Sequence, residues 1–195
     1  MNTNNKIYTL VSMGILTAVV IVLQAVASGI HIGPFSITLV LAPIIVGAAL
    51  YGVLAGAWLG LVFGIVVLLT DAGVFLAINI PGTIITCLAK GVFAGVAAGF
   101  VYRLLQEKNR LFAVIIASIV APVVNTGLFL LGCRIFFYDT IVEWSAGYES
   151  VFAFMIFGLV GINFIVETII NLVLSSTIVQ ILSIVGKHFQ TKKDS

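Results

Sequence analysis

The sequence predicts an all-α integral membrane protein, a six-transmembrane-helix bundle with both termini in the cytoplasm. Of its 195 residues, 62% are hydrophobic and only 8% are charged, and the mean hydropathy is +1.28. These values lie far outside the range of soluble domains. At roughly 30 residues per span and connection, the length allows about five to seven membrane helices and no large extramembrane domain. Residues 1–195 are therefore expected to form a single transmembrane domain.

Six apolar runs qualify as spans, at about residues 8–29, 36–50, 54–69, 83–103, 111–133 and 151–185. Turn-forming residues separate the first four runs, including the Gly33-Pro34 pair and the Tyr51-Gly52 pair. The last run would be about 50 Å long as a continuous helix, longer than a hydrocarbon core of about 30 Å. It must therefore tilt, begin outside the bilayer, or break near Gly158 and Gly161.

The basic residues predict the orientation of the chain in the membrane. Seven of the nine Lys and Arg residues fall on one face, namely Lys6, Arg103, Lys108, Arg110, Lys187, Lys192 and Lys193. By the positive-inside tendency this face is cytoplasmic, so both termini are cytoplasmic and the protein lies in the cell membrane. The opposite face carries Asp71, Asp139, Glu143 and Glu149, with Arg134 as its one predicted basic residue.

Several functional classes are disfavoured by what the sequence contains. No G-x-x-x-x-G-K-[ST] pattern occurs, so transport against a gradient would need ion flow or a partner's ATP. The basic residues are scattered around helix ends, which does not favour nucleic-acid binding. Cys87 and Cys133 lie in apolar runs, and His31 and His188 fall in a loop and a tail. We therefore expect no metal site and no cofactor, and no enzyme motif is present.

Small residues recur at helical spacing in three spans. Those of the third and fourth spans, Gly52, Gly56, Gly60, Gly64, Gly91, Gly95 and Gly99, are expected to pack these two helices against each other. Gly14 and Ala18 form a smaller groove on the first span. This groove could pack within the chain or face a separate membrane subunit.

Polar side chains form stripes in two spans. The fourth span carries Asn79, Thr83, Thr86 and Lys90 at steps of four, three and four, and the sixth carries Asn163, Glu167 and Asn171 at steps of four. Asn125 lies in the middle of the fifth span. A charge near the bilayer centre costs several kcal/mol, so Lys90 and Glu167 should face the interior. They either form an ion pair or line a ligand cavity that opens to the outer face.

The segment 134–150 is rich in aromatic residues and has two interpretations. Trp and Tyr often anchor a membrane protein at the lipid interface. Alternatively, the segment covers the cavity as a lid, with Trp144 or Tyr148 packing on a small ligand. Arg134, at its start, completes the set of candidate ligand-binding residues.

Two segments resemble a known family. Residues 33–43 (GPFSITLVLAP) and 47–56 (GAALYGVLAG), together with the six-span plan and the Gly14 and Ala18 pair, resemble the substrate-binding S components of energy-coupling factor (ECF) vitamin transporters. The family commonly has Ala where this chain has Gly14, which preserves the small face. The resemblance implies capture of a vitamin at the outer face and delivery through a transmembrane coupling subunit with two ATPase subunits. It also implies that the first three helices dock while the outer loops and the last three helices hold the ligand.

Residues 35–56 and 163–174 look closest to pantothenate-type S components. Pantothenate is a small polyhydroxylated carboxylate, for which a lysine, threonines and asparagines are suitable partners. Folate, riboflavin and hydroxymethylpyrimidine remain open, and these flat ligands would use Trp144, Tyr148 and phenylalanines for stacking. Two other classes compete: a stand-alone ion-coupled carrier in which Glu167 titrates, and an intramembrane enzyme using Glu167 with Lys90.

Overall fold

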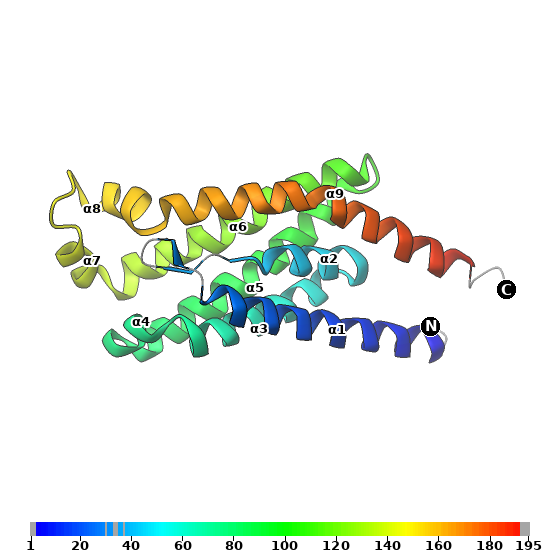
Figure 1. The fold of residues 1–195 in the computed structure, drawn as a ribbon, viewed down its shortest axis with the longest axis horizontal. Helices are drawn as coiled ribbons and strands as arrows, with labels where there is room; N and C mark the ends of the chain where they lie inside the picture. The colour runs from blue at the N-terminus through cyan, green and yellow to red at the C-terminus, as the bar shows by residue number, and fades with distance from the viewer. Residues whose placement is uncertain (1–2, 30, 33–34, 37, 192–195) are drawn as a thin grey trace.

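A computed structural model describes the chain except for residues 1–2, 30, 33–34, 37 and 192–195. The described residues form an elongated bundle of helices (Figure 1). The long helices are α1 (Thr3–Ala27), α3 (Val53–Thr70), α5 (Ile80–Leu105), α6 (Arg110–Phe136) and α9 (Gly161–Thr191). The shorter elements are β1 (His31–Ile32), β2 (Phe35–Ser36), α2 (Leu41–Tyr51), α4 (Gly73–Ile78), α7 (Tyr138–Trp144), α8 (Val151–Ala153) and the π-helix η1 (Phe154–Val160). The predicted Gly33-Pro34 turn, Lys192 and Lys193 lie outside the described residues, and the side chains of His31, Lys187 and His188 are not described either.

Five segments of the described chain are long and apolar enough to cross a membrane: Lys6–Ala27, Val53–Thr70, Ile80–Leu105, Arg110–Phe136 and Val151–Val185. The second predicted span, 36–50, differs from the prediction. Its helix α2 has only 11 residues, about 16 Å at 1.5 Å per residue. Residues 38–40 before it are not helical. The structure therefore has five full-length helices and one shorter apolar helix.

Pro43 explains why α2 begins late. It is the third residue of the helix and has no N–H to donate to Leu39, so a helix that begins at Leu41 lacks no hydrogen bond at this proline. The first backbone bond of the helix accordingly runs from the Ile44 N–H to the Val40 carbonyl, at 3.3 Å.

The last span changes its hydrogen-bond register near Gly158 and Gly161, where a break was one of the three alternatives for this long run. Helix α8 passes directly into the seven-residue π-helix η1, which ends at Val160, and α9 begins at Gly161. The chain thus stays helical through Gly158 and Gly161, and the predicted interruption is a π-helical segment.

Helices α3, α5 and α6 pack closely and position the site. A Cβ atom at Gly60 would overlap the Gly91 carbonyl, and one at Gly95 would overlap the Gly56 carbonyl. At Gly64 a Cβ would lie 2.6 Å from the Cys87 carbonyl oxygen. The predicted packing of the third and fourth spans through glycines is therefore confirmed, except at Gly52, which lies between α2 and α3 with a φ of 94° and would meet nothing within 4 Å of an added Cβ.

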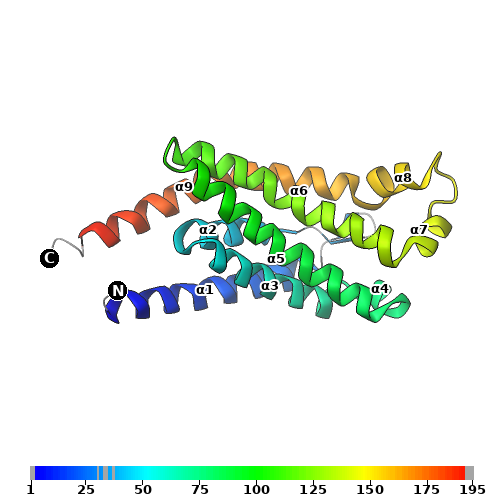
Figure 2. The ribbon, with the colours of Figure 1, turned by 180° about the vertical axis from the view of Figure 1, so that it is seen from behind.

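The two ends of the bundle differ in what they hold. Helix α1 begins and α9 ends at the same end as the α5–α6 connection, whereas α4, α7 and α8 lie at the opposite end (Figures 1 and 2). The acidic residues Asp71, Asp139 and Glu143 belong to or adjoin the elements of this opposite end.

Candidate ligand-binding site

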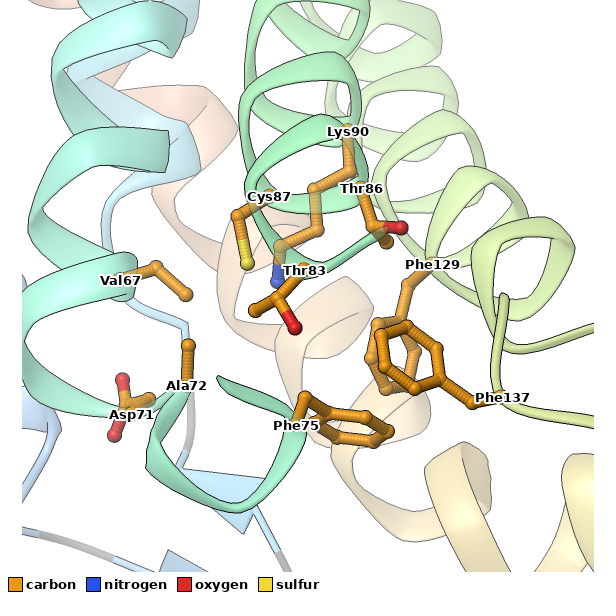
Figure 3. A pocket seen from close by; sticks show the side chains of 10 residues that line it. All are labelled: Val67, Asp71, Ala72, Phe75, Thr83, Thr86, Cys87, Lys90, Phe129 and Phe137. Atoms are coloured by element: carbon orange, nitrogen blue, oxygen red, sulfur yellow. The ribbon is translucent and has the colours of Figure 1, made fainter. Parts of the chain in front are cut away.

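A small cavity lies between α3, α4, α5 and α6, toward the end of the bundle that carries α4 and α7 (Figure 3). Its volume is about 40 Å³. Its lining residues are Val67, Asp71, Ala72, Phe75, Thr83, Thr86, Cys87, Lys90, Phe129 and Phe137. Three of the predicted ligand-binding residues, Thr83, Thr86 and Lys90, are therefore brought together here.

Lys90 carries the positive charge of this cavity. It is ten residues into α5, which places it about 15 Å along the helix. Its Nζ atom lies 5.6 Å from the ring centre of Phe63 and 5.4 Å from that of Phe129, as in cation–π contacts. In the described part of the chain, no carboxylate forms an ion pair with Lys90.

The two threonines have different hydrogen bonds. The Thr83 hydroxyl donates to the Asn79 carbonyl at 2.7 Å, within its own helix. Thr86 packs against Gly132 of α6, and its buried hydroxyl has no hydrogen bond among the described residues. The Thr86 hydroxyl therefore remains available to a ligand as donor or acceptor.

Asn79 belongs to the same stripe but does not line the cavity. It is the N-cap of α5, where its Oδ1 atom accepts a hydrogen bond from the Gly82 N–H at 2.9 Å. Its Nδ2 atom donates to the Phe136 carbonyl at 3.5 Å. Asn79 thus fixes the start of α5 against the end of α6, which is a structural role.

Aromatic rings lie at the end of the cavity nearest α4 and α7. The Phe75 ring lies edge-on to three others, with centroid distances of 4.9 Å to Phe137, 5.7 Å to Phe129 and 5.9 Å to Trp144. Trp144 is half exposed and does not line the cavity itself. It contacts the aromatic cluster through Phe75.

Tyr148 and Arg134 lie apart from the cavity lining. Tyr148 packs edge-on against Phe154 at 5.1 Å, and its hydroxyl lies over Gly158 of η1. Arg134 is exposed, and its guanidinium stacks on the Tyr138 ring at 3.8 Å. Of the three predicted residues in segment 134–150, Trp144 contacts the cavity residue Phe75, while Arg134 and Tyr148 pack on Tyr138 and Phe154.

The polar residues of α6 and α9 form a separate buried group. Asn125 and Glu167 are 5% and 4% exposed, and neither lines the cavity. The Asn125 Oδ1 and Glu167 Oε1 atoms accept no hydrogen bond from described residues, while Asn171 donates to the Glu167 carbonyl at 2.9 Å. Asn163, on the same stripe, is half-buried. The alternative of a Lys90–Glu167 ion pair is not found in the described structure.

Asp71 is the cavity residue that sequence reasoning missed. The sequence placed it only among acidic residues of an outer loop. In the structure its Oδ2 atom accepts hydrogen bonds from the Gln24 side chain at 2.6 Å and, more weakly, from the Thr70 hydroxyl at 3.4 Å. The sequence does contain a signal for this pair. Asp71 follows the apolar run 54–69, and Gln24 is a polar residue inside the apolar run 8–29.

Gly14 and Ala18 differ from the packing glycines. Both are exposed on α1, and a Cβ atom added at Gly14 would meet nothing within 4 Å. The groove that they form is therefore not used for packing within the described chain.

Comparisons with known proteins agree with the resemblance of the sequence. The model of the family "ECF transporter, substrate-specific component" matches residues 8–183. The Pantothenic acid transporter PanT of Lactococcus lactis subsp. cremoris (strain MG1363) is 27% identical over 189 residues, covering 88% of this chain and 91% of that protein. No solved structure matches the chain. The family match spans nearly the whole bundle, so this membrane protein belongs to the substrate-specific components of ECF transporters, which are transport proteins and not enzymes.

Proposed function

We propose that this chain captures pantothenate at the outer face of the cell membrane. It then delivers the vitamin through a transmembrane coupling subunit that carries two ATPase subunits. Family membership supports a vitamin as substrate and an ECF module as partner. The name of the PanT relative supports pantothenate among the vitamins.

The observation that carries this proposal is the Lys90 ammonium in the cavity. Its Nζ atom lies over the Phe63 and Phe129 rings, and no carboxylate of the described residues lies within ion-pair distance of it. Cation–π contacts contribute about 0.5–2 kcal/mol each, less than the several kcal/mol that an ammonium costs in a membrane. A ligand carboxylate would supply the missing countercharge, and the Thr86 hydroxyl would supply a hydrogen bond beside it.

The volume of the cavity implies a conformational change on binding. About 40 Å³ has room for water, whereas ligand pockets usually measure about 300–1,000 Å³. The Phe75 and Phe137 rings fill the outer end, so entry of a vitamin requires them to move. The structure thus corresponds to a contracted state of the proposed site.

The orientation follows from the same proposal. The end with α4 and α7 faces outward because the cavity lies near it and its acidic residues contrast with Arg103, Lys108 and Arg110 at the other end. Both termini are then cytoplasmic. The exposed groove at Gly14 and Ala18 is proposed to dock on the coupling subunit, since small residues allow close helix approach.

The aromatic cluster around Phe75 favours a second candidate, an S component for a flat vitamin such as folate, riboflavin or hydroxymethylpyrimidine. Ring stacking, rather than Lys90, would then dominate binding. Native mass spectrometry of the protein purified from its own cells distinguishes the two by the mass of the co-purified ligand. Pantothenate is the expected mass, and one of the other vitamins would replace the first candidate with the second.

A further inference from the structure

Asp71 belongs to the wall of the cavity, but its carboxylate is turned away from it. Figure 3 shows the two carboxylate oxygens pointing away from Lys90, whose side chain extends into the cavity from α5. The Oδ2 atom of Asp71 instead accepts a hydrogen bond from the Nε2 atom of Gln24, at 2.6 Å. The side chain of Asp71 therefore fixes this part of the cavity wall from outside the cavity.

Gln24 is a buried amide of the first helix. Its side chain is 1% exposed, and it lies one turn before the end of α1 at Ala27. Burial of an amide is costly unless the amide forms hydrogen bonds. The bond to Asp71 meets this requirement for the Gln24 NH₂ group and connects α1 to the end of α3.

Asp71 and Ala72 form the corner between α3 and α4, and no other residue separates these helices. The N–H groups of both residues donate to the Val67 carbonyl, at 2.9 and 3.1 Å. The Ala72 carbonyl in turn accepts from the Leu76 N–H of α4, at 2.9 Å. Because backbone hydrogen bonds join the corner to both helices, a displacement of Asp71 is passed on to α4.

Helix α4 places Phe75 at the cavity. The Phe75 ring is 5% exposed, lines the cavity, and lies edge-on to the Phe129 and Phe137 rings. A cavity of about 40 Å³ admits a vitamin only when these rings move apart. The position of the α3–α4 corner therefore bears directly on whether the cavity is open or closed.

We infer that Gln24 is a positioning residue. Its hydrogen bond to Asp71 holds the α3–α4 corner against α1 and so keeps α4, with Phe75, closed over the cavity. This inference rests on the proposed function, in which the vitamin enters past these rings, and it adds the residue that controls entry. Loss of the bond releases the corner and increases the fraction of molecules whose cavity is open.

The test measures how fast Cys87 reacts with a charged, water-soluble methanethiosulfonate reagent. Cys87 lines the cavity and is 7% exposed, and it is the one cysteine left in the background Cys133→Ala, because the chain has two. When opening and closing are faster than the reaction, the labelling rate follows the fraction of molecules with an open cavity. The measurement uses the full chain in detergent and needs no ligand.

Three variants isolate the hydrogen bond. Gln24→Met removes the donor and keeps the length of the side chain, and Asp71→Ala removes the acceptor. Thr17→Val is the matched control, because it removes another side-chain hydrogen bond between α1 and α3, from Trp58 Nε1 to Thr17 Oγ1 at 3.1 Å. Neither Thr17 nor Trp58 lines the cavity.

We expect Gln24→Met and Asp71→Ala each to raise the Cys87 labelling rate by about tenfold, the scale of one lost hydrogen bond to a carboxylate. The double variant should label no faster than either single variant, because both changes break the same bond. Thr17→Val should label at the parent rate. Pantothenate should slow the labelling of the parent; absence of this protection would count against the proposed function and leave the comparison of the variants intact.

Global unfolding would also expose Cys87, so a second reporter is needed. Ser118→Cys, in a chain with Cys87→Ala and Cys133→Ala, provides it, because Ser118 is 0% exposed in α6 and does not line the cavity. An unchanged Cys87 rate in Gln24→Met would overturn the inference. Equal acceleration of both reporters would also overturn it, because Gln24 would then stabilise the whole bundle, and so would an effect of Thr17→Val as large as that of Gln24→Met.

Discussion

Lys90 is the residue on which the proposed function depends most. An ammonium this far along a membrane helix is tolerated only when it faces the protein interior, water or a countercharge. Here it faces a cavity, with the Phe63 and Phe129 rings as its described neighbours. In the proposed function, a ligand carboxylate supplies the countercharge.

Lys90→Met tests whether the ammonium binds a carboxylate. We expect pantothenate binding to weaken by about 1.5–3 kcal/mol, the value of a hydrogen bond to a charged group. A neutral amide analogue of pantothenate should bind parent and variant alike. Isothermal titration calorimetry of the purified proteins measures both ligands. Lys108→Met, an exposed change near the α5–α6 connection, is the control and should leave both affinities unchanged.

The opposite result would show that Lys90 stabilises the fold and does not bind the ligand. If Lys90→Met binds pantothenate normally but melts at a lower temperature without ligand, the lysine stabilises the fold. Recovery of that melting temperature in the double variant with Glu167→Gln would then indicate a structural charge pair.

The sequence predicted part of this site because helical spacing alone places side chains on one face. Thr83, Thr86 and Lys90 share a face of α5 and meet in the cavity. Asp71 could not be assigned in the same way, because its position depends on a hydrogen bond from Gln24, 47 residues away along the chain. Asn79 had the predicted spacing, but at the start of a helix its side chain caps the backbone.

Helices α3 and α5 approach each other through glycine pairs. The backbone of each helix occupies the space that a Cβ of the other would need, at Gly60 with Gly91 and at Gly56 with Gly95. Both helices carry cavity residues, so their separation sets the width of the site.

Gly60→Ala is expected to destabilise the protein by about 1–3 kcal/mol, because the added methyl group would overlap backbone atoms that cannot rotate away. Thermal unfolding in detergent measures this effect. Gly127→Ala is the matched control, since Gly127 lies in helix α6 with nothing within 4 Å of its added Cβ. An equal loss of stability in both variants would contradict the packing argument.

Gly14→Leu, or Ala18→Leu, tests the role of the exposed groove on α1. Because a Cβ at Gly14 meets nothing within 4 Å, the larger side chain should leave folding and ligand affinity intact. It should prevent close approach of the coupling subunit and abolish uptake. Co-purification of the complex and ligand affinity are measured on the same variant, with Gly127→Leu as control. Loss of ligand affinity with retained complex formation would show that the groove serves another purpose.

The long helices followed from apolar runs and turn residues. The short elements β1, β2, α4 and α7 did not, and neither did two features of the predicted spans. The short α2 depends on Pro43, whose missing N–H limits how early the helix can begin. The π-helix η1 was not predicted, because a break near Gly158 and Gly161 was only one of three alternatives for the long last run. An apolar run does not specify which hydrogen-bond register its backbone adopts.

At the scale of the whole molecule, aromatic contacts connect the cavity to segment 134–150. Phe75 of α4 contacts Phe137 at the end of α6 and Trp144 at the end of α7. Enlarging the cavity for a vitamin must therefore displace rings that Trp144 touches. The lid function of segment 134–150 remains a prediction. The contact between Trp144 and Phe75 is the one through which the lid would sense the cavity.

Tryptophan fluorescence tests this coupling. The chain has two tryptophans, and the other, Trp58, is an exposed residue of α3 that donates to the Thr17 hydroxyl at 3.1 Å. Saturating pantothenate should change the emission of the Trp58→Phe variant as much as that of the parent. The Trp144→Phe variant should lose the change. A full response in Trp144→Phe would exclude this segment as the lid.

Equilibrium binding of radiolabelled pantothenate to the purified chain, without any coupling subunit, tests the central claim most directly. We expect saturable binding that excess unlabelled pantothenate displaces and that folate, riboflavin and hydroxymethylpyrimidine do not. The same protein alone in liposomes should transport nothing when a proton gradient is imposed. Absence of saturable pantothenate binding, or uptake by this chain alone, would contradict the account.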